Sequence, residues 1–184
     1  MTLSKASLPL ETCLEILNLG NDLIAIHDGE GNRVYVSPSI RDILGYFAEE
    51  LIGKPEMDIV HPDDIPEARN LFSQVLQNPG KTFKGDLCLR NKNGDTIVVN
   101  YRVTNLLHNP KVQGIVINYH DVTDRKKTEQ QLRESEEKYH NLVEHAQDGV
   151  VIVQDGVFKF VNSAWCRICG YQKEDLLNAS FLET

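Results

Sequence analysis

Alternation of apolar and polar residues predicts three β-strands in the middle of the chain. Over residues 83–89, 97–103 and 115–119, the odd-numbered positions are apolar, aromatic or glycine, and most even-numbered positions are polar. Successive side chains of a strand point to opposite faces of a sheet, so the odd positions are expected to face a core. Asn91–Asp95 has the composition of a hairpin turn between the first two strands.

Two further strands and two helices are predicted upstream. The apolar run Leu23–Ile26 and the segment 34–36 flank a turn at Asp28–Asn32, which indicates a hairpin. Ser37, followed by proline, has the pattern of an N-cap, and Gly45 that of a helix end. Residues 65–76 form a second amphipathic helix. Together these elements predict an α+β fold, a five-stranded antiparallel sheet with helices on one face.

The predicted hairpin and first helix occur twice in the sequence. Asp22–Tyr46 matches Asp148–Tyr171, with an offset of 126 residues before the turn and 125 after it. A repeat of this length is typical of tandem domains rather than of a solenoid.

Both copies resemble the opening of a PAS domain. That family typically shows a strand, an acidic-Gly turn, a Tyr-Val-Asn-Pro segment, and Gly-Tyr followed by Glu-Leu-Ile-Gly. The first copy has Ser37 where the family often has Asn, and the second keeps Asn162 but has Ser163 in place of proline. His61–Asp64 resembles the His-Pro-Asp-Asp signature of the same family.

The resemblance divides the chain into four parts. It implies an N-terminal helix within residues 1–21, a PAS domain over 22–122, a linker or signalling helix over 123–146, and the start of a second PAS domain over 147–184. The second copy lacks counterparts of the last three strands, so we expect it to be truncated, with an incomplete core. We expect the native protein to continue into a complete second domain.

Composition excludes several functions. The net charge of −8 and the absence of a basic patch argue against nucleic-acid binding. No apolar run reaches the ~20 residues of a membrane span, so we expect no membrane in this segment and a cytoplasmic location. The chain also lacks Gly-rich phosphate loops, nucleophile elbows and paired catalytic carboxylates, and we expect no enzymatic activity.

No cofactor is expected from the candidate ligands. The six histidines lack the spacing of a metal site. Haem-binding PAS domains use a histidine on the helix that corresponds to residues 65–76, and flavin photosensors use a cysteine shortly after Gly53 and Lys54; both are missing here. Cys166 and Cys169 form a CxxC pair that we assign to packing. His27 either enters the core cavity or is a hydrogen-bonded core residue.

The PAS resemblance implies two functional sites. A pocket between the sheet and the helices is expected to take a small apolar or aromatic ligand, or none. Its predicted lining consists of Met57, Leu71, Leu89, Val99, Tyr101, Ile117 and Tyr119. Asp121 and Thr123 resemble the Asp-x-Thr motif by which PAS domains pass a signal to the following helix. The alternative is that both residues only cap that helix.

The linker helix is expected to join two copies of the chain. Its apolar residues Leu132, Tyr139 and Ala146 are seven positions apart. Two heptads are fewer than a coiled coil needs, so a solvated linker remains the alternative. The N-terminal helix, through Leu10, Leu14 and Leu17, is expected to contribute to the homodimer.

These features predict a sensory or regulatory PAS module of a cytoplasmic signal-transduction protein. We expect the host to be a sensor histidine kinase, with a downstream signalling domain in the same protein. One alternative is a constitutive dimerisation or docking module with a filled core. Another is the sensor part of a diguanylate cyclase or a transcriptional regulator. A pocket of about 300 Å³ or more would favour ligand sensing over docking.

Overall fold

The computed structural model describes residues 22–177 and residue 179. The predicted N-terminal helix, with Leu10, Leu14 and Leu17, lies outside the described residues. The chain divides into two units, the first ending at Lys126 and the second beginning at Lys127.

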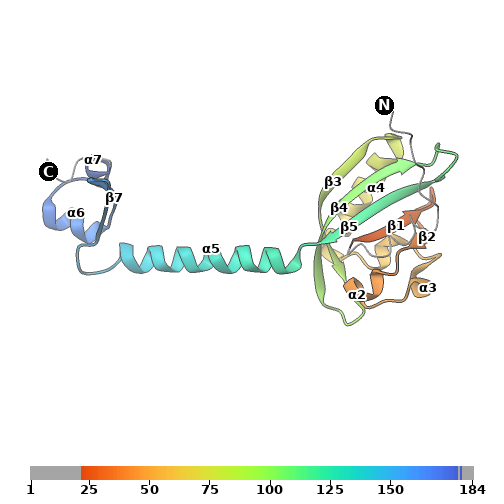
Figure 1. Cartoon of the computed structure of the whole chain (residues 1–184), viewed down its shortest axis with the longest axis horizontal. Coiled ribbons are helices and arrows are strands. Elements are labelled where there is room, and N and C mark those ends of the chain that lie inside the picture. The colour runs from red at the N-terminus through yellow and green to blue at the C-terminus, as the bar shows by residue number, and fades with distance from the viewer. Residues whose placement is uncertain (1–21, 178, 180–184) are drawn as a thin grey trace, which may run out of the picture. The chain divides into compact units, whose positions relative to one another are not determined.

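A five-stranded antiparallel sheet forms the first unit (Figure 1). Its strands are β1 (Leu23–His27), β2 (Arg33–Val36), β3 (Thr82–Arg90), β4 (Thr96–Leu106) and β5 (Gly114–Asp121). The spatial order is β2-β1-β5-β4-β3, so the last strand of the sequence lies at the centre, between β1 and β4. The predicted sheet is confirmed, and residues 99, 101 and 103 of β4 and 115, 117 and 119 of β5 are buried in the core, as the alternation indicated.

The helices that pack in the core of the first unit lie between β2 and β3 in the sequence. They are α2 (Ile40–Leu44), α3 (Ala48–Leu51), the 3₁₀ turns η1 (Glu56–Asp58) and η2 (Pro62–Asp64), and α4 (Ile65–Gln77). Ala68 and Val75 of α4 are buried in the same core cluster as Leu87 of β3 and Val99 of β4. This packing leaves the cavity described below between α4, η1 and the inner face of the sheet.

The prediction that Ser37 caps the first helix was wrong. Helix α2 begins only at Ile40, and the Ser37 hydroxyl instead accepts a hydrogen bond from the backbone N–H of Ile24, at 2.9 Å. Its side chain can bond to β1 because Ser37 directly follows β2, which pairs with β1 in the sheet. Gly45 ends the helix as predicted, with a φ of 75° that favours glycine.

The second copy of the repeat uses the same local contacts. Asn162 stands where Ser37 stands, and its side-chain oxygen accepts from the Val150 N–H at 2.9 Å. The Asn162 amide also donates to the carbonyl of Asp148, whereas in the first copy Ser39 donates to the equivalent carbonyl of Asp22. One asparagine therefore does what two hydrogen-bonded serines do in the first copy.

Helix α5 (Thr123–Glu144) leads from the first unit into the second. The second unit contains the two-stranded sheet of β6 (Val151–Gln154) and β7 (Val157–Val161), then α6 (Ser163–Cys169) and α7 (Lys173–Leu176). Its buried apolar cluster consists of Phe158, Val161 and Leu176. In the described part of the chain, no helix is both long and apolar enough to span a membrane.

Candidate functional site

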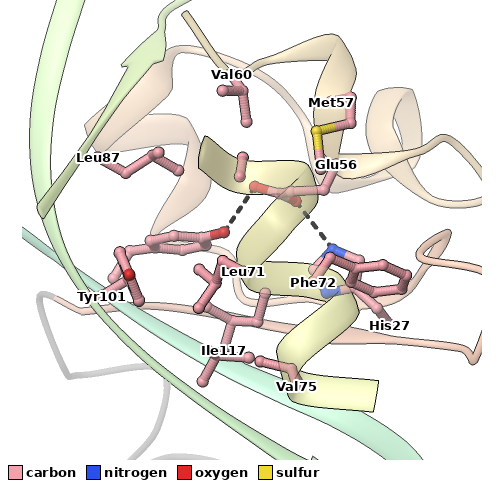
Figure 2. Close-up of a pocket in the computed structure, with 13 residues that line it drawn as sticks. His27, Glu56, Met57, Val60, Leu71, Phe72, Val75, Leu87, Tyr101 and Ile117 are labelled. Carbon is pink, nitrogen blue, oxygen red and sulfur yellow. Dashed lines mark hydrogen bonds and ion pairs between the residues drawn. The ribbon is translucent and has the colours of Figure 1, made fainter. Parts of the chain in front are cut away.

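The candidate site is a cavity inside the first unit. Its wall is formed by β1, η1, α4 and the strands β3, β4 and β5 (Figure 2). The lining residues are His27, Glu56, Met57, Val60, Ala68, Leu71, Phe72, Val75, Leu87, Tyr101, Val103, Ile117 and Tyr119. The cavity volume is about 40 Å³. A buried water needs roughly 10–15 Å³ of such space, so the cavity could accommodate about three waters or one small molecule.

Five of the seven residues predicted to line a pocket do so. Met57, Leu71, Tyr101, Ile117 and Tyr119 are on the cavity wall, and the last two come from the central strand β5.

The other two, Leu89 and Val99, are fully buried but lie outside the wall. Leu89 forms a β-bridge with Val60, and this contact encloses its end of β3 in the continuous core. Strand alternation correctly assigned both side chains to the inner face, but it could not locate the empty space along that face.

One end of the cavity is polar, and the carboxylate of Glu56 is its centre. Figure 2 shows this side chain with His27 on one side and a tyrosine hydroxyl on the other. One carboxylate oxygen accepts from His27 Nε2 and from Arg33 Nε, both at 2.9 Å. The other oxygen accepts from the Tyr119 hydroxyl at 2.8 Å. Glu56 therefore connects β1, β2 and β5, because each of these strands supplies one donor.

Arg33 neutralises the charge of Glu56 beneath the cavity. Its side chain is 1% exposed, and that of Glu56 is 12% exposed. Nη1 donates to the carbonyls of Lys54 and Pro55, and Nη2 donates to that of Glu56, at 3.0 to 3.4 Å. A buried ion pair persists only when its other polar atoms are satisfied, and here the backbone of residues 54–56 supplies the acceptors.

The contacts of Glu56 shift the pKa values of the cluster. Burial acts to raise the pKa of Glu56, but the hydrogen bond from His27 and the charge of Arg33 outweigh it and hold the pKa below its usual 4.5. Burial, the charge of Glu56 and the hydrogen bond to it raise the pKa of Tyr119 well above its usual 10.0. The site thus holds an ionised carboxylate and a neutral phenol.

The imidazole of His27 has one unsatisfied nitrogen. An ionised carboxylate can only accept hydrogen bonds, so Nε2 carries the proton that is shared with Glu56. Among residues 22–177 and 179, Nδ1 of His27 is the fully buried side-chain nitrogen or oxygen without a hydrogen-bond partner. His27 is 1% exposed and lines the cavity. The two alternatives for His27, cavity wall and hydrogen-bonded core residue, therefore both hold.

Sequence reasoning missed the polar end of the cavity. Glu56 lies in a short 3₁₀ turn, without strand or helix periodicity to show its orientation. Its partners His27, Arg33 and Tyr119 are 29, 23 and 63 residues away in the sequence. The available signals were His27, a candidate for the cavity, and Arg33, a charged residue directly before the predicted strand 34–36.

The predicted relay residues lie where β5 meets α5. Asp121 is the last residue of β5, and its carboxylate accepts from the N–H of Thr123, the first residue of α5, at 2.8 Å. The hydroxyl of Thr123 accepts from the Val98 N–H at 2.9 Å and lies 3.4 Å from the Val98 carbonyl. Asp121 therefore caps the helix, whereas Thr123 attaches its first turn to β4.

Comparisons with known proteins agree with this architecture. A family model described as "PAS fold" matches residues 33–117, and one described as "PAS domain" matches residues 137–183. The aryl hydrocarbon receptor nuclear translocator homolog of Drosophila melanogaster is 32% identical over 80 residues, which are 44% of this chain and 12% of that protein. The Period circadian protein of Hyalophora cecropia is 25% identical over 85 residues, 46% of this chain and 24% of that protein. The chain thus spans no more than about a quarter of these relatives.

Solved structures show the same fold. The PAS domain of a Colwellia psychrerythraea protein aligns with a TM-score of 0.55 and 19% identity, covering 62% of this chain and 98% of that one. A domain of the sensory box sensor histidine kinase/response regulator from Geobacter sulfurreducens aligns with a TM-score of 0.51 and 21% identity, covering 60% and 93%. The chain therefore belongs to the PAS domain family, with one PAS domain followed by part of a second.

Proposed function

We propose that this chain is the sensory PAS module of a sensor histidine kinase, and that β5 and α5 relay the state of its core to a downstream domain of the same protein. The observation that carries the proposal is the course of β5. Ile117 and Tyr119 form part of the cavity wall, and two residues later Asp121 caps the helix that leaves the domain.

The relay has a short physical path. Any change in the hydrogen bonds of Glu56 acts on the Tyr119 hydroxyl, and therefore on the register and twist of β5. Tyr119 pairs with Tyr101 on β4, and Asp121 pairs with Val99 on the same strand. A shift of β5 relative to β4 would therefore strain the contacts of Thr123 with Val98, where α5 is attached.

The small cavity limits the input. About 40 Å³ is well below the ~300 Å³ typical of a drug-sized ligand site. We therefore propose an input that is either a small molecule or contact with a partner protein, without haem or flavin. The same observation favours the second candidate function, a constitutive dimerisation or docking module. We propose no catalytic role for this chain.

Two substitutions at Thr123 test the relay in the full-length protein. Thr123→Val keeps the shape of the side chain but removes both contacts of the hydroxyl, whereas Thr123→Ser keeps them. We expect Val to uncouple stimulus from kinase autophosphorylation and Ser to preserve the response.

Asp121→Ala is the companion test. Loss of a cap costs typically about 1 kcal/mol, so the protein should stay folded while its response is reduced. A normal response in Asp121→Ala and Thr123→Val would show that both residues only cap and anchor α5. That result would favour the second candidate function, a constitutive dimerisation or docking module. The identity of the host is tested by sequencing the coding region downstream of this segment. A diguanylate cyclase or DNA-binding domain there would contradict the proposal of a histidine kinase.

A further inference from the structure

We propose that the cavity binds a small neutral molecule with an aliphatic body of about three carbons and one hydroxyl donor, which hydrogen-bonds Nδ1 of His27. The inference deepens the proposed function by naming a ligand class for the same cavity. Binding itself does not depend on the proposed function, but any effect of the ligand on signalling rests on it. Three properties of the cavity define the class: its free acceptor, its charge balance and its size.

The free acceptor is Nδ1 of His27. The bond from Nε2 to Glu56 places a proton on Nε2, so in the neutral imidazole Nδ1 has a bare lone pair. Arg33 already compensates the charge of Glu56, and a second buried cation would lack a counter-charge of its own. A buried acceptor without a partner carries a desolvation penalty that a suitable donor removes. Because Nδ1 can only accept in this tautomer, a ligand with a donor group is favoured over one with acceptors alone.

The charge balance favours a neutral ligand. Glu56 is already paired with Arg33, and its two oxygens accept three hydrogen bonds. Beyond His27 and Glu56, the wall of the cavity consists of apolar side chains and the tyrosines Tyr101 and Tyr119. A charged ligand would leave water without a compensating charge, which is costly in an apolar site.

The size restricts the aliphatic body. An empty cavity of 150 Å³ in another protein accommodates benzene, and the cavity here has about 40 Å³. A molecule of about four non-hydrogen atoms is therefore near the upper limit without rearrangement. Its aliphatic part would contact Leu71, Phe72 and Val75 of α4 and Ile117 of β5.

The probe pair 2-propanol and acetone tests the donor requirement. The two molecules have the same heavy-atom skeleton, but only 2-propanol can donate to Nδ1. We expect 2-propanol to bind about two- to tenfold more tightly than acetone, the range for one hydrogen bond. The readouts are amide chemical shifts of residues around the cavity and the ¹⁵N shift of His27 Nδ1 in the full chain. Equal binding of both probes with no change at Nδ1, as expected if the cavity holds only water, would overturn the proposal.

A matched pair of histidine variants tests the residue. His27→Gln retains an amide donor for Glu56 but removes the acceptor at the Nδ1 position. It should lose the preference for 2-propanol. His120→Gln is the control, because His120 also contacts a carboxylate, that of Asp22, but is exposed and outside the cavity wall. Should His27→Gln retain the 2-propanol preference, the assignment of Nδ1 would be wrong; the wild-type comparison of the two probes decides the case if the variant does not fold.

Hydrogen exchange at the start of α5 separates this inference from the proposed function. If 2-propanol binds and also changes the exchange of amides 124–128, both proposals are supported. If it binds at His27 without any effect on these amides, the ligand site stands and the relay of a ligand signal is contradicted.

Discussion

Single residues determine the stability of the buried polar cluster, which consists of His27, Arg33, Glu56 and Tyr119. Arg33 keeps its charge away from water because Glu56 compensates it, and the backbone carbonyls of residues 54–56 accept hydrogen bonds from its Nη1 and Nη2. Removal of one partner from a buried pair leaves the other charge uncompensated, which costs more than the pair contributes when intact.

Glu56→Gln should therefore destabilise the first unit strongly. We expect the free energy of unfolding to fall by about 3 kcal/mol, the lower part of the range for a broken buried pair, measured by urea denaturation. Glu50→Gln is the control, because Glu50 pairs with Lys92 at the surface and its loss should leave the midpoint unchanged. Similar midpoints for the two variants would contradict the ion-pair assignment.

Glu56 also predicts how stability depends on acid. Its pKa is lower in the folded protein than the usual 4.5, so the unfolded chain binds the proton first as the pH falls. The stability that Glu56 contributes is complete above about pH 4.5 and is lost as the pH falls through the lower, folded pKa. Urea titrations between pH 3 and pH 7 (roughly the range of carboxyl linkage) should show this slope in the wild type and a smaller one in Glu56→Gln.

Tyr119 predicts the opposite limb of the pH profile. Its pKa is raised in the folded protein, so above the usual 10.0 the unfolded chain loses the proton first and the folded state becomes less stable. Tyr119→Phe should lower stability at neutral pH by about 1.5–3 kcal/mol, the value of a hydrogen bond to a charged group, but should flatten the alkaline decline. An alkaline slope that is identical in wild type and Tyr119→Phe would rule out this linkage.

Among the helices, α5 has the surface most suited to a partner. Leu132, Tyr139 and Leu142 are 60%, 66% and 61% exposed, and Leu132 and Tyr139 are one heptad apart. Burial of such side chains is worth about 1.5–3 kcal/mol each when complete. We propose that these residues pack against a second copy of α5 in a homodimer, with the N-terminal segment as a further contact.

Glutamates in place of two of these exposed apolar residues should prevent dimer formation. The double variant Leu132→Glu/Tyr139→Glu places like charges opposite each other in a parallel pair. We expect sedimentation equilibrium to show a monomer for it and a dimer for the wild type. Gln130→Glu/Asn141→Glu adds the same charge on the opposite side of the helix and should remain dimeric. A monomeric wild type at high micromolar concentration would instead favour the solvated linker.

Across the whole chain, the two units differ in the size of their cores. The first unit buries residues of the sheet and helices in one extended cluster, whereas the described cluster of the second consists of Phe158, Val161 and Leu176 with a few half-buried neighbours. In the second unit Ile152 and Ile168 are 54% and 67% exposed. A two-stranded hairpin is marginally stable in water without a larger hydrophobic face.

Hydrogen exchange should show this difference directly. Amides of β6 and β7 (151–154 and 157–161) should exchange much faster than those of β4 (96–106). The β1–β2 hairpin is an internal control, because it has the same local sequence pattern but belongs to the five-stranded sheet. Equal protection of the two hairpins in a dilute monomer would show that the second unit folds by itself.

Much of the fold followed from local patterns. The alternation in β4 and β5 placed their odd residues in the core, and Gly45 and Gly170 ended α2 and α6 in the left-handed conformation. These features depend on neighbouring residues or on the pleat of one strand, so sequence alone determined them. The repeat was equally visible, because Asp22–Tyr46 and Asp148–Tyr171 match along the sequence. The structure shows that Ser37 and Asn162, at equivalent positions, both bond back to the first strand or its start.

The tertiary structure alone decided the chemistry of the cavity. Glu56 meets His27, Arg33 and Tyr119 only after β5 has inserted between β1 and β4 and η1 has folded back over the sheet. The same long-range packing fills the space around Leu89 and Val99 and leaves room beside Ile117. Strand periodicity specifies which face a side chain occupies, whereas the position of a cavity and the partners of a buried charge depend on how distant segments fit together in space.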